Sequence, residues 1–343
     1  MRAGPLNARD FLARSCPHRG AAAALVLLAL LPCAARCQIT THQANDIRTG
    51  IENRVEALTI LGGDFGLSDG NFSSRARLRP GSASANVETH VTKAGGDGDI
   101  GDPRPLGDLN IGWQPRVQGN MGYIESTNLP RSGLRASDSS EYTTYAIEFG
   151  GGARFWLSDR FSLAPTLMGL YGRTSNNYTA RSAFMRANRN LAAQLGLIDW
   201  SVDTWTLRPA LNIQYVITLN RTIITLSSDP TYFHTEGFNS SNPNVRINGN
   251  SGSVANKIDV DVPLRIELAG HELRSGGYLS RTDLFGGLRS GLDVEHMNEI
   301  HGRLVLDFLN QFWKVQWIGV GASYIWGTNI TGWTAGADVA FRF

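Results

Sequence analysis

The last thirteen residues constrain the fold of this chain most strongly. Thr331 to Phe343 reads TGWTAGADVAFRF, and apolar side chains occupy every second position back from the carboxyl terminus. Successive side chains of a strand point to opposite faces, so one face is apolar with aromatic ends and the other is small or charged. A soluble sheet would bury the apolar face, whereas a membrane barrel would turn it to lipid and turn the charged face to its lumen. The rest of the chain has to decide between the two.

The first 37 residues have the pattern of an export signal. Four arginines precede an apolar run from Ala21 to Leu31, and small residues follow at Cys33 to Ala35 and at Ala35 to Cys37, which gives two candidate cleavage sites. The run is shorter than the ~20 residues that a membrane-spanning helix needs. All three cysteines lie at or before Cys37, so we expect a mature chain without disulfides.

Composition beyond the signal limits the function classes. Removal of residues 1–37 takes away five arginines and one aspartate, and leaves 27 basic and 29 acidic residues. This near-neutral balance gives no reason to expect a nucleic-acid partner. No later apolar run reaches helix-spanning length. If the protein is integral to a membrane, it must be a closed β-barrel, since only helices and barrels satisfy all backbone polar groups in lipid.

Long alternating segments fill most of the chain. Most of them have 10–16 residues, enough for a tilted strand to cross the hydrocarbon and longer than the ~5–6 residues usual in soluble sheets. We therefore predict an all-β fold, a closed antiparallel transmembrane barrel, over a secreted β-domain. Twelve strands fit best, and fourteen if residues 57–79 contribute a hairpin. The twelve candidate strands are 84–93, 108–114, 117–128, 142–157, 161–175, 202–219, 222–236, 257–268, 276–288, 298–309, 313–326 and 331–343, and 71–79 is a further weak candidate.

The connections between these strands alternate in length. Outer-membrane barrels have short periplasmic turns and longer outer loops, so with a periplasmic carboxyl terminus the long segments lie outside. The long segments are 94–106, 129–140, 176–200, 237–256 and 289–297. The segment 176–200 has a candidate helix over 181–195.

The residues before the barrel have helical spacing of apolar side chains at Ile47, Ile51, Val55 and Leu58. We expect an amphipathic helix over 38–60 that either plugs the lumen or lies in the periplasm. The predicted organisation is a signal peptide at 1–37, a helix and linker segment at 38–70, and the barrel at 71–343.

Two local features qualify the strand pattern. Pro165, Pro209 and Pro263 lie within predicted strands, where each lacks a ladder donor, so we expect bulges there and another near Trp317. Aromatic side chains gather towards strand ends, as an interfacial girdle requires: Tyr142, Tyr145, Trp156, Tyr171, Trp205, Trp313, Trp326 and Trp333.

The hairpin Ala146–Leu170 and the terminal strand resemble the translocator domain of autotransporters, and most of all the solitary autotransporter-like outer-membrane barrels. The resemblance covers roughly residues 45–343. It implies a place in the bacterial outer membrane and a terminal signal that the barrel-assembly machinery reads, at Trp333, Val339, Phe341 and Phe343. Only some 40 residues separate the signal from the barrel, so passenger export is not the expected role.

Charged residues of both signs fall on the predicted inward face. They either line a channel that weakly selects solutes, or pair with one another in a partly plugged lumen. These candidates are Glu148, Arg154, Arg208, Asp259, Asp261, Arg265, Glu267, Arg281, Asp283, Glu299, Arg303, Asp307, Asp338 and Arg342.

Catalytic and metal motifs are weak. His301 falls inward near Glu299 and Asp307, but no GxSxG motif is present, so we expect a packed or ion-paired histidine and no enzyme activity. Residues 95–102 partly resemble a Gly/Asp calcium loop, but lack the terminal glutamate of an EF-hand, which favours a plain acidic loop. We expect no cofactor and no metal.

The sequence thus supports three hypotheses. The first is a non-enzymatic outer-membrane barrel, with a narrow pore as its activity. The second is a surface interaction or adhesion protein that binds a partner through loops 176–200 and 237–256 on a plugged barrel. The third, an outer-membrane hydrolase, has the least support. Expected partners are outer-membrane lipid, lipopolysaccharide and the barrel-assembly machinery, and the sequence carries no signal for an oligomeric state.

Overall fold

A computed structural model describes residues 41–63, 67–76, 85–107, 109–129, 138–312 and 315–341. Contacts divide the chain into Met1–Ala44 and Asn45–Phe343, and all strands of the barrel belong to the second unit. The predicted signal segment lies outside the described residues. No helix in the described ranges is long and apolar enough to cross a membrane.

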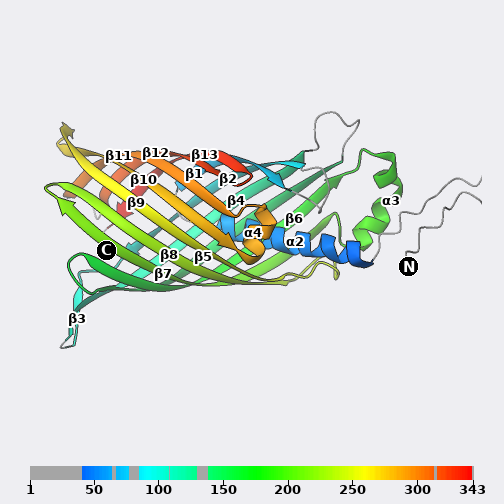
Figure 1. Cartoon of the computed structure of the whole chain (residues 1–343), viewed down its shortest axis with the longest axis horizontal. Helices are drawn as coiled ribbons and strands as arrows, with labels where there is room; N and C mark the ends of the chain where they lie inside the picture. Colours follow the sequence, from blue (N-terminus) through cyan, green and yellow to red (C-terminus); the bar gives the residue numbers. More distant parts are fainter. Residues whose placement is uncertain are drawn as a thin grey trace, which may run out of the picture. The chain divides into compact units, whose positions relative to one another are not determined.

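Twelve antiparallel strands form a closed ring, and β2 pairs with β4 to complete it (Figure 1). A short thirteenth strand, β3 (Arg104–Leu106), pairs only with β4. The ring consists of β1 (Leu67–Ala76), β2 (Ala85–Asp99), β4 (Leu109–Leu129), β5 (Ser139–Trp156), β6 (Phe161–Thr179), β7 (Trp200–Leu219), β8 (Thr222–Phe238), β9 (Asn248–Leu268), β10 (His271–Phe285), β11 (His296–Phe312), β12 (Val315–Gly327) and β13 (Ile330–Phe341). The helices are α2 (Thr41–Gly62), α3 (Ala183–Gln194) and α4 (Gly286–Leu292). The prediction of a twelve-stranded barrel preceded by a helix is confirmed.

The two ends of the barrel differ in their connections. One end, called here the turn end, carries the tight turns 157–160, 220–221 and 269–270. Asn220 and Gly270 take positive φ values of 55° and 81° in two of these turns, a conformation that asparagine and glycine tolerate best. The other end, the loop end, carries α3, the segment 239–247 and α4.

Strand β5 shows why the sequence forms a barrel wall. Its outward Tyr145, Ile147 and Phe149 are 59%, 53% and 72% exposed, whereas the intervening Ala146 and Glu148 are buried. Large apolar side chains that alternate with buried polar ones suit a wall with lipid outside and a polar lumen inside. The predicted inward and outward faces of β5 are therefore confirmed.

Strand β4 corrects part of the prediction. Residues 108–114 and 117–128 are not two strands, because β4 runs through Pro115, which pairs with Ala153 without a register shift. β2 also continues to Asp99, so the segment 94–106 belongs to the wall and to the turn end and is not an outer loop. The twelfth strand is β1 instead.

Other local predictions had mixed outcomes. The helix over 181–195 is confirmed by α3, and the bulge near Trp317 by a register shift between Val315 and Trp317. Beside Pro263 the register also shifts, and Arg265 takes a φ of 58° there. Pro165 and Pro209 interrupt the ladders but leave the register unchanged, so the bulges expected at those two prolines are wrong.

Two features of the loop end differ from the sequence-based expectation. β9 begins at Asn248, so only 239–247 of the predicted loop 237–256 is a loop, and the helix α4 was not expected. At the start of β9 the inward residues are Gly249 and Ser251, which are small because they lie against α2. A strand without inward or outward apolar residues carries no alternation for a sequence pattern to detect.

Not every aromatic residue of the predicted girdle faces outward. Tyr142 is buried against Trp200, and Trp156 donates a hydrogen bond to the inward Gln114 over 2.9 Å. Tyr145, Tyr171, Trp205 and Trp333 are outward and exposed. The girdle therefore exists, but it is formed by fewer residues than the sequence suggested.

The lipid-facing wall can be tested by adding one charge at two depths. Phe149 lies near the middle of β5, and Leu219 ends β7 at the turn end. Phe149→Arg should lower the free energy of unfolding in lipid vesicles by about 2–4 kcal/mol, and Leu219→Arg by about 0–1 kcal/mol. Denaturant titration of both refolded variants checks this. Equal losses at the two positions would contradict a hydrocarbon layer around the middle of the barrel.

Candidate functional site

The centre of the barrel is occupied by the last turns of α2, from Ile51 to Gly63, which are called the plug here. Most of its side chains are buried, and those of Val55, Ala57 and Thr59 are fully so. Figure 1 shows α2 at the loop end of the barrel, and residues of β2, β4, β5, β7, β8, β10 and β13 pack in the same clusters as its side chains. A twelve-stranded ring is wider than the ~8-stranded barrels that wall side chains can fill, and an α-helix with its side chains has a diameter of about 10–12 Å.

Two apolar clusters pack against different sides of the plug. The first joins Ile51, Val55 and Leu58 to residues of β2, β4, β5, β7 and the segment before β9: Val91, Ile124, Tyr142, Trp200, Val202, Val245 and Ile247. The second joins Ala57 and Ile60 to β8, β10, α4 and β13 through Phe233, Leu284, Leu288, Val294 and Ile330. The helix is thus in apolar contact with most of the ring, and not with one wall only.

Polar contacts fix the depth of the plug. Arg54 Nη2 donates to Ser126 Oγ over 2.7 Å, and its guanidinium lies 5.0 Å from the ring centre of Tyr142. At the deep end, the carbonyl oxygen of Gly63 accepts from Asn120 Nδ2 over 3.1 Å. Burial is the largest influence on the pKa of the Arg54 guanidinium, and it lowers that pKa.

Glu56 is the most unusual residue of the plug. Its carboxylate is buried, and Oε1 accepts a 2.6 Å hydrogen bond from Ser251 Oγ, which in turn accepts from the backbone N–H of Leu288 over 2.8 Å. Oε2 has no hydrogen-bond partner among the described residues. Burial therefore raises the pKa of Glu56, and the charge of Glu52 raises it further, while the Ser251 hydrogen bond and the charge of His234 act in the opposite direction.

Glycines in the wall make room for the helix backbone. A Cβ at Gly122 would lie 2.3 Å from the carbonyl oxygen of Gly62, and one at Gly291 would lie 2.1 Å from that of Asn53. Neither glycine has a positive φ, so they are needed for space and not for their backbone conformation. The helix and the ring are therefore fitted to each other at the level of the backbone.

A charged cluster lies just beyond the end of the helix. Arg208 Nη1 donates to both carboxylate oxygens of Glu148 over 2.8 Å, and Asn120 Nδ2 donates to Glu148 Oε2 over 3.0 Å. Glu148 is almost completely buried. An unpaired buried carboxylate would be costly, and these contacts supply its partners from β4 and β7.

Beyond this cluster the lumen contains a cavity of about 660 Å³, lined on one side by Ile60 and Leu61 of α2. Its wall carries ion pairs between different strands, one of which spans β10 from β11 to β9. Arg303 binds Asp259 through two nitrogens, at 2.8 and 2.7 Å, and Arg274 Nε donates to Asp261 over 2.8 Å.

The Gly/Asp segment 95–102 forms another part of this wall. Asp99 accepts from Arg116 over 3.0 Å and from Arg154 over 2.9 Å, and Arg116 also pairs with Asp97. These aspartates lie on β2 as partners of arginines, so the expectation of a plain acidic loop is wrong. Among the residues whose placement is described, no group of three or more His, Cys, Asp or Glu side chains could hold a metal ion.

His301 lies in the cavity wall, packed between two other side chains. Its ring stacks on Tyr278 with centres 4.7 Å apart, and its Nδ1 lies 2.8 Å from Ser323 Oγ. Ser323 is the direct cross-strand neighbour of His301, so the hydrogen bond is of the kind that adjacent strands commonly form. Glu299 accepts a 2.8 Å hydrogen bond from the Tyr278 hydroxyl.

The predicted lumen residues do not all reach the lumen. Those on the inward face are Glu148, Arg154, Arg208, Asp259, Asp261, Glu299, Arg303 and Asp307. Arg265 and Glu267 are exposed close to the turn end. The side chain of Asp338, the side chains of Val339 and Phe341, and residues Arg342 and Phe343 lie outside what the structure describes.

Arg281 and Asp283 correct the prediction. They alternate with Tyr278, Ser280, Thr282 and Leu284, which line the cavity, so both face outward, where Arg281 pairs with Asp283 over 2.9 Å. The inward face of β10 was misassigned because its loop-end residues are apolar where they meet the plug.

Several residues of the site were not singled out from the sequence. Arg54 and Glu56 belong to a helix that the sequence places in either the lumen or the periplasm, so their burial had no sequence signal. Asn120 and Arg116 lie on β4. The sequence did not predict them as lumen residues, because the predicted strand was divided at Pro115. An uninterrupted strand there would have placed both on the inward face by alternation.

Comparison with known proteins agrees with this architecture. The family model described as "Solitary outer membrane autotransporter beta-barrel domain" matches residues 104–335. The transport unit of the autotransporter AIDA-I from Escherichia coli is similar with a TM-score of 0.55 and 9% identity, over 85% of this chain and 99% of that one. The translocator domain of the autotransporter NalP from Neisseria meningitidis gives 0.50 and 11%, over 90% and 100%. No curated protein sequence matches the chain.

The likeness to the two solved structures concerns the fold alone, because the identities are low. The family match covers most of the chain, and it coincides with the strands that build the charged lumen. An alternating outer wall and a closed ring with an even number of antiparallel strands are general features of bacterial outer-membrane barrels. The chain belongs to the solitary outer-membrane autotransporter β-barrel family, and its barrel is a protein of the outer membrane.

Proposed function

We propose that this protein is a plugged barrel, whose resting state does not conduct ions and whose lumen becomes a narrow pore only when the plug is displaced. The observation that carries the proposal is the apolar packing of the plug against most of the ring. The charged cavity beyond the plug would line that pore. In this proposal residues 1–37 direct export, the turn end faces the periplasm, and the protein is not an enzyme.

The barrel-assembly signal is part of the same proposal. Trp333 is outward and half exposed on β13, where an assembly factor could contact it. Val339, Phe341 and Phe343 are the other proposed members. Their recognition is inferred from the family likeness and from the alternation of the terminal strand.

A second function, binding of a partner at the loop end, is supported by the way in which α3 is held. Asp138 accepts hydrogen bonds from the backbone N–H groups of Arg181 and Ser182 over 2.6 and 2.8 Å. Asn242 and Asn244 donate to the last carbonyls of α3 over 2.6 and 2.9 Å. A fixed helix at the rim offers a surface that needs no ordering on binding.

We expect conductance to distinguish the two functions. The double variant Gly122→Ala/Gly291→Ala places a methyl group against the backbone of α2 from two sides, so it should displace the plug. In planar bilayers the unaltered barrel should be closed, and the variant should show discrete openings.

The matched control is Gly96→Ala/Gly302→Ala, because a Cβ at either position meets no atom within 4 Å. It should remain closed, and all three proteins should show heat-modifiable gel mobility. Openings of the same size in the unaltered barrel would contradict a sealing plug. Persistent closure of a folded Gly122→Ala/Gly291→Ala barrel would leave partner binding as the better function.

The stability of the plugged state should depend on pH through Glu56. The docked residue has a pKa raised above the ordinary 4.5, so the docked state binds a proton more tightly than a released helix does. Docking is therefore strongest below the ordinary pKa and weakens as the pH rises through the raised value. Open probability should increase with pH over this window.

Glu56→Gln should remove most of that pH dependence, because glutamine keeps the shape and stays neutral. Asp46→Asn is the matched control on the same helix, since Asp46 is exposed and is not among the charges that shift the pKa of Glu56. Single-channel recording across the pH range measures both variants. An unchanged pH profile in Glu56→Gln would show that another group controls the plug.

A further inference from the structure

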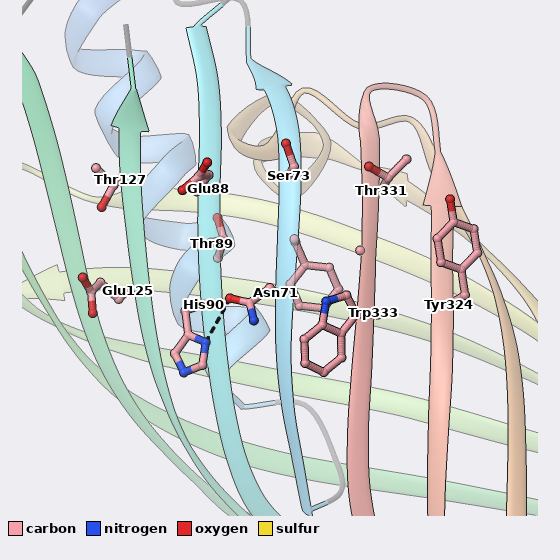
Figure 2. Close-up of a pocket in the computed structure, with 12 residues that line it drawn as sticks. Asn71, Ser73, Glu88, Thr89, His90, Glu125, Thr127, Tyr324, Thr331 and Trp333 are labelled. Atoms are coloured by element: carbon pink, nitrogen blue, oxygen red, sulfur yellow. Dashed lines mark hydrogen bonds between the residues drawn. The ribbon is translucent and has the colours of Figure 1, made fainter.

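A groove of about 620 Å³ lies on the wall where β12, β13, β1, β2 and β4 run side by side. Figure 2 shows its principal side chains, with His90 and Asn71 in the centre and Trp333 and Tyr324 on one side. Phe72 packs against the apolar clusters inside the barrel, and Val87 and Val91 are buried. Asn71, Glu88 and His90 alternate with those residues and therefore point outward.

The groove lies close to the loop end. Trp333 is the fourth residue of β13 and Tyr324 the fourth from the end of β12. They are half exposed, as interfacial aromatic residues commonly are. On the other side of the groove Tyr123 and Tyr145 lie with ring centres 5.0 Å apart. The groove therefore separates two aromatic parts of the girdle.

The lining is too polar for lipid chains. Glu88 and Glu125 face the groove with Asn71, Ser73, His90, Thr127 and Thr331. His90 Nδ1 lies 3.2 Å from Asn71 Oδ1, and His90 Nε2 lies 3.3 Å from Thr92 Oγ1. A charged side chain destabilises a barrel when it contacts hydrocarbon at depth, and much less so near the interface. The groove is therefore suited to a polar neighbour at headgroup level.

The charge of the lining selects among polar neighbours. Among the described side chains that line it, two are carboxylates and none is lysine or arginine. A phosphate group would be repelled by Glu88 and Glu125. Sugar hydroxyls, in contrast, can donate to carboxylates, which gives stronger hydrogen bonds than neutral acceptors do, and the apolar face of a sugar ring can pack on the exposed indole of Trp333.

We propose that this groove binds the sugar headgroup of an outer-leaflet glycolipid. Glu88 and Glu125 accept hydrogen bonds from ring hydroxyls, Asn71 and His90 complete the polar floor, and Trp333 and Tyr324 cover the apolar face of a sugar. The acyl chains of the same lipid lie along the outward apolar residues next to the groove. This inference rests on the proposed orientation, with the turn end in the periplasm, but it does not depend on the plug or on conductance.

A second cluster on the outer wall contains the same residue types and provides a control. Trp205 lies edge-on to His234, with ring centres 5.8 Å apart. His234 contacts Asn250 and Glu236 at 3.0 and 3.2 Å. Tyr232 also donates to Asn250 over 2.5 Å. These polar groups bond mainly to one another, so they are not expected to bind a sugar.

The test is native mass spectrometry of the refolded barrel with two lipids of equal acyl chains. Digalactosyl diacylglycerol carries sugars without phosphate, and phosphatidylglycerol carries a phosphate without a sugar ring. The unaltered barrel should retain the sugar lipid at least tenfold better than the phosphate lipid.

Two variants separate recognition from assembly. Trp333→Leu removes the aromatic wall but alters the terminal strand, so Glu88→Leu/Glu125→Leu is the second variant, which leaves β13 unchanged. Each should lower retention of the sugar lipid about tenfold, while heat-modifiable mobility remains. Trp205→Leu/Glu236→Leu should retain it as the unaltered barrel does. Equal binding of phosphatidylglycerol, or an equal loss in the control variant, would overturn the proposal.

Discussion

The width of the twelve-stranded ring is the constraint on which the rest of the structure depends. Side chains of the wall fill barrels of about eight strands, and rings of about sixteen leave an aqueous channel, so a ring of twelve needs one further element to close it. The plug supplies this element. Its presence explains the small inward residues of the wall, since Gly122, Gly172 and Gly249 lie against α2, as does Gly291 of α4. The plug and the ring therefore specify each other.

Ion pairs between strands line the part of the lumen that the helix does not fill. Arg208 with Glu148, Arg303 with Asp259 and Arg274 with Asp261 are pairs between different strands. Removing one partner of such a pair costs more than the pair contributes, because a buried charge is left without compensation. The first two pairs each span an intervening strand and the third joins neighbouring strands, so the pairs act more on the order of the strands around the ring than on the total stability. They also leave little free charge with which an open lumen could select ions.

Much of this could be predicted from the sequence, and the misses have physical causes. Apolar side chains that alternate with polar ones are a strong sequence signal when one face of a strand meets lipid. The barrel, the terminal strand and the inward positions of Glu148 and Arg303 could be predicted from this pattern. The alternation of apolar and polar side chains is absent where a strand contacts the helix, because both faces of the segment 248–253 carry only small or polar residues there. It also fails at Pro115, where a residue that commonly ends strands is tolerated inside one. The contacts of Glu56 with Ser251 join residues far apart in sequence, and no local pattern contains them.

The wrong assignment of Arg281 and Asp283 and the groove on the outer wall have one common cause. Apolar residues are required outward only in the hydrocarbon, whereas near the loop end outward positions meet headgroups and water. Arg281 with Asp283, His234 with Glu236, and the lining of the groove all lie in the outer part of their strands. In the first two sets the charged or polar groups bond to each other. In the groove His90 also contacts Asn71, and Glu125 accepts from the Tyr123 hydroxyl over 3.3 Å. Glu88 and Glu125 lie on the neighbouring strands β2 and β4, opposite Trp333 and Tyr324, an arrangement in which ring hydroxyls can reach the carboxylates while the ring packs on the indole.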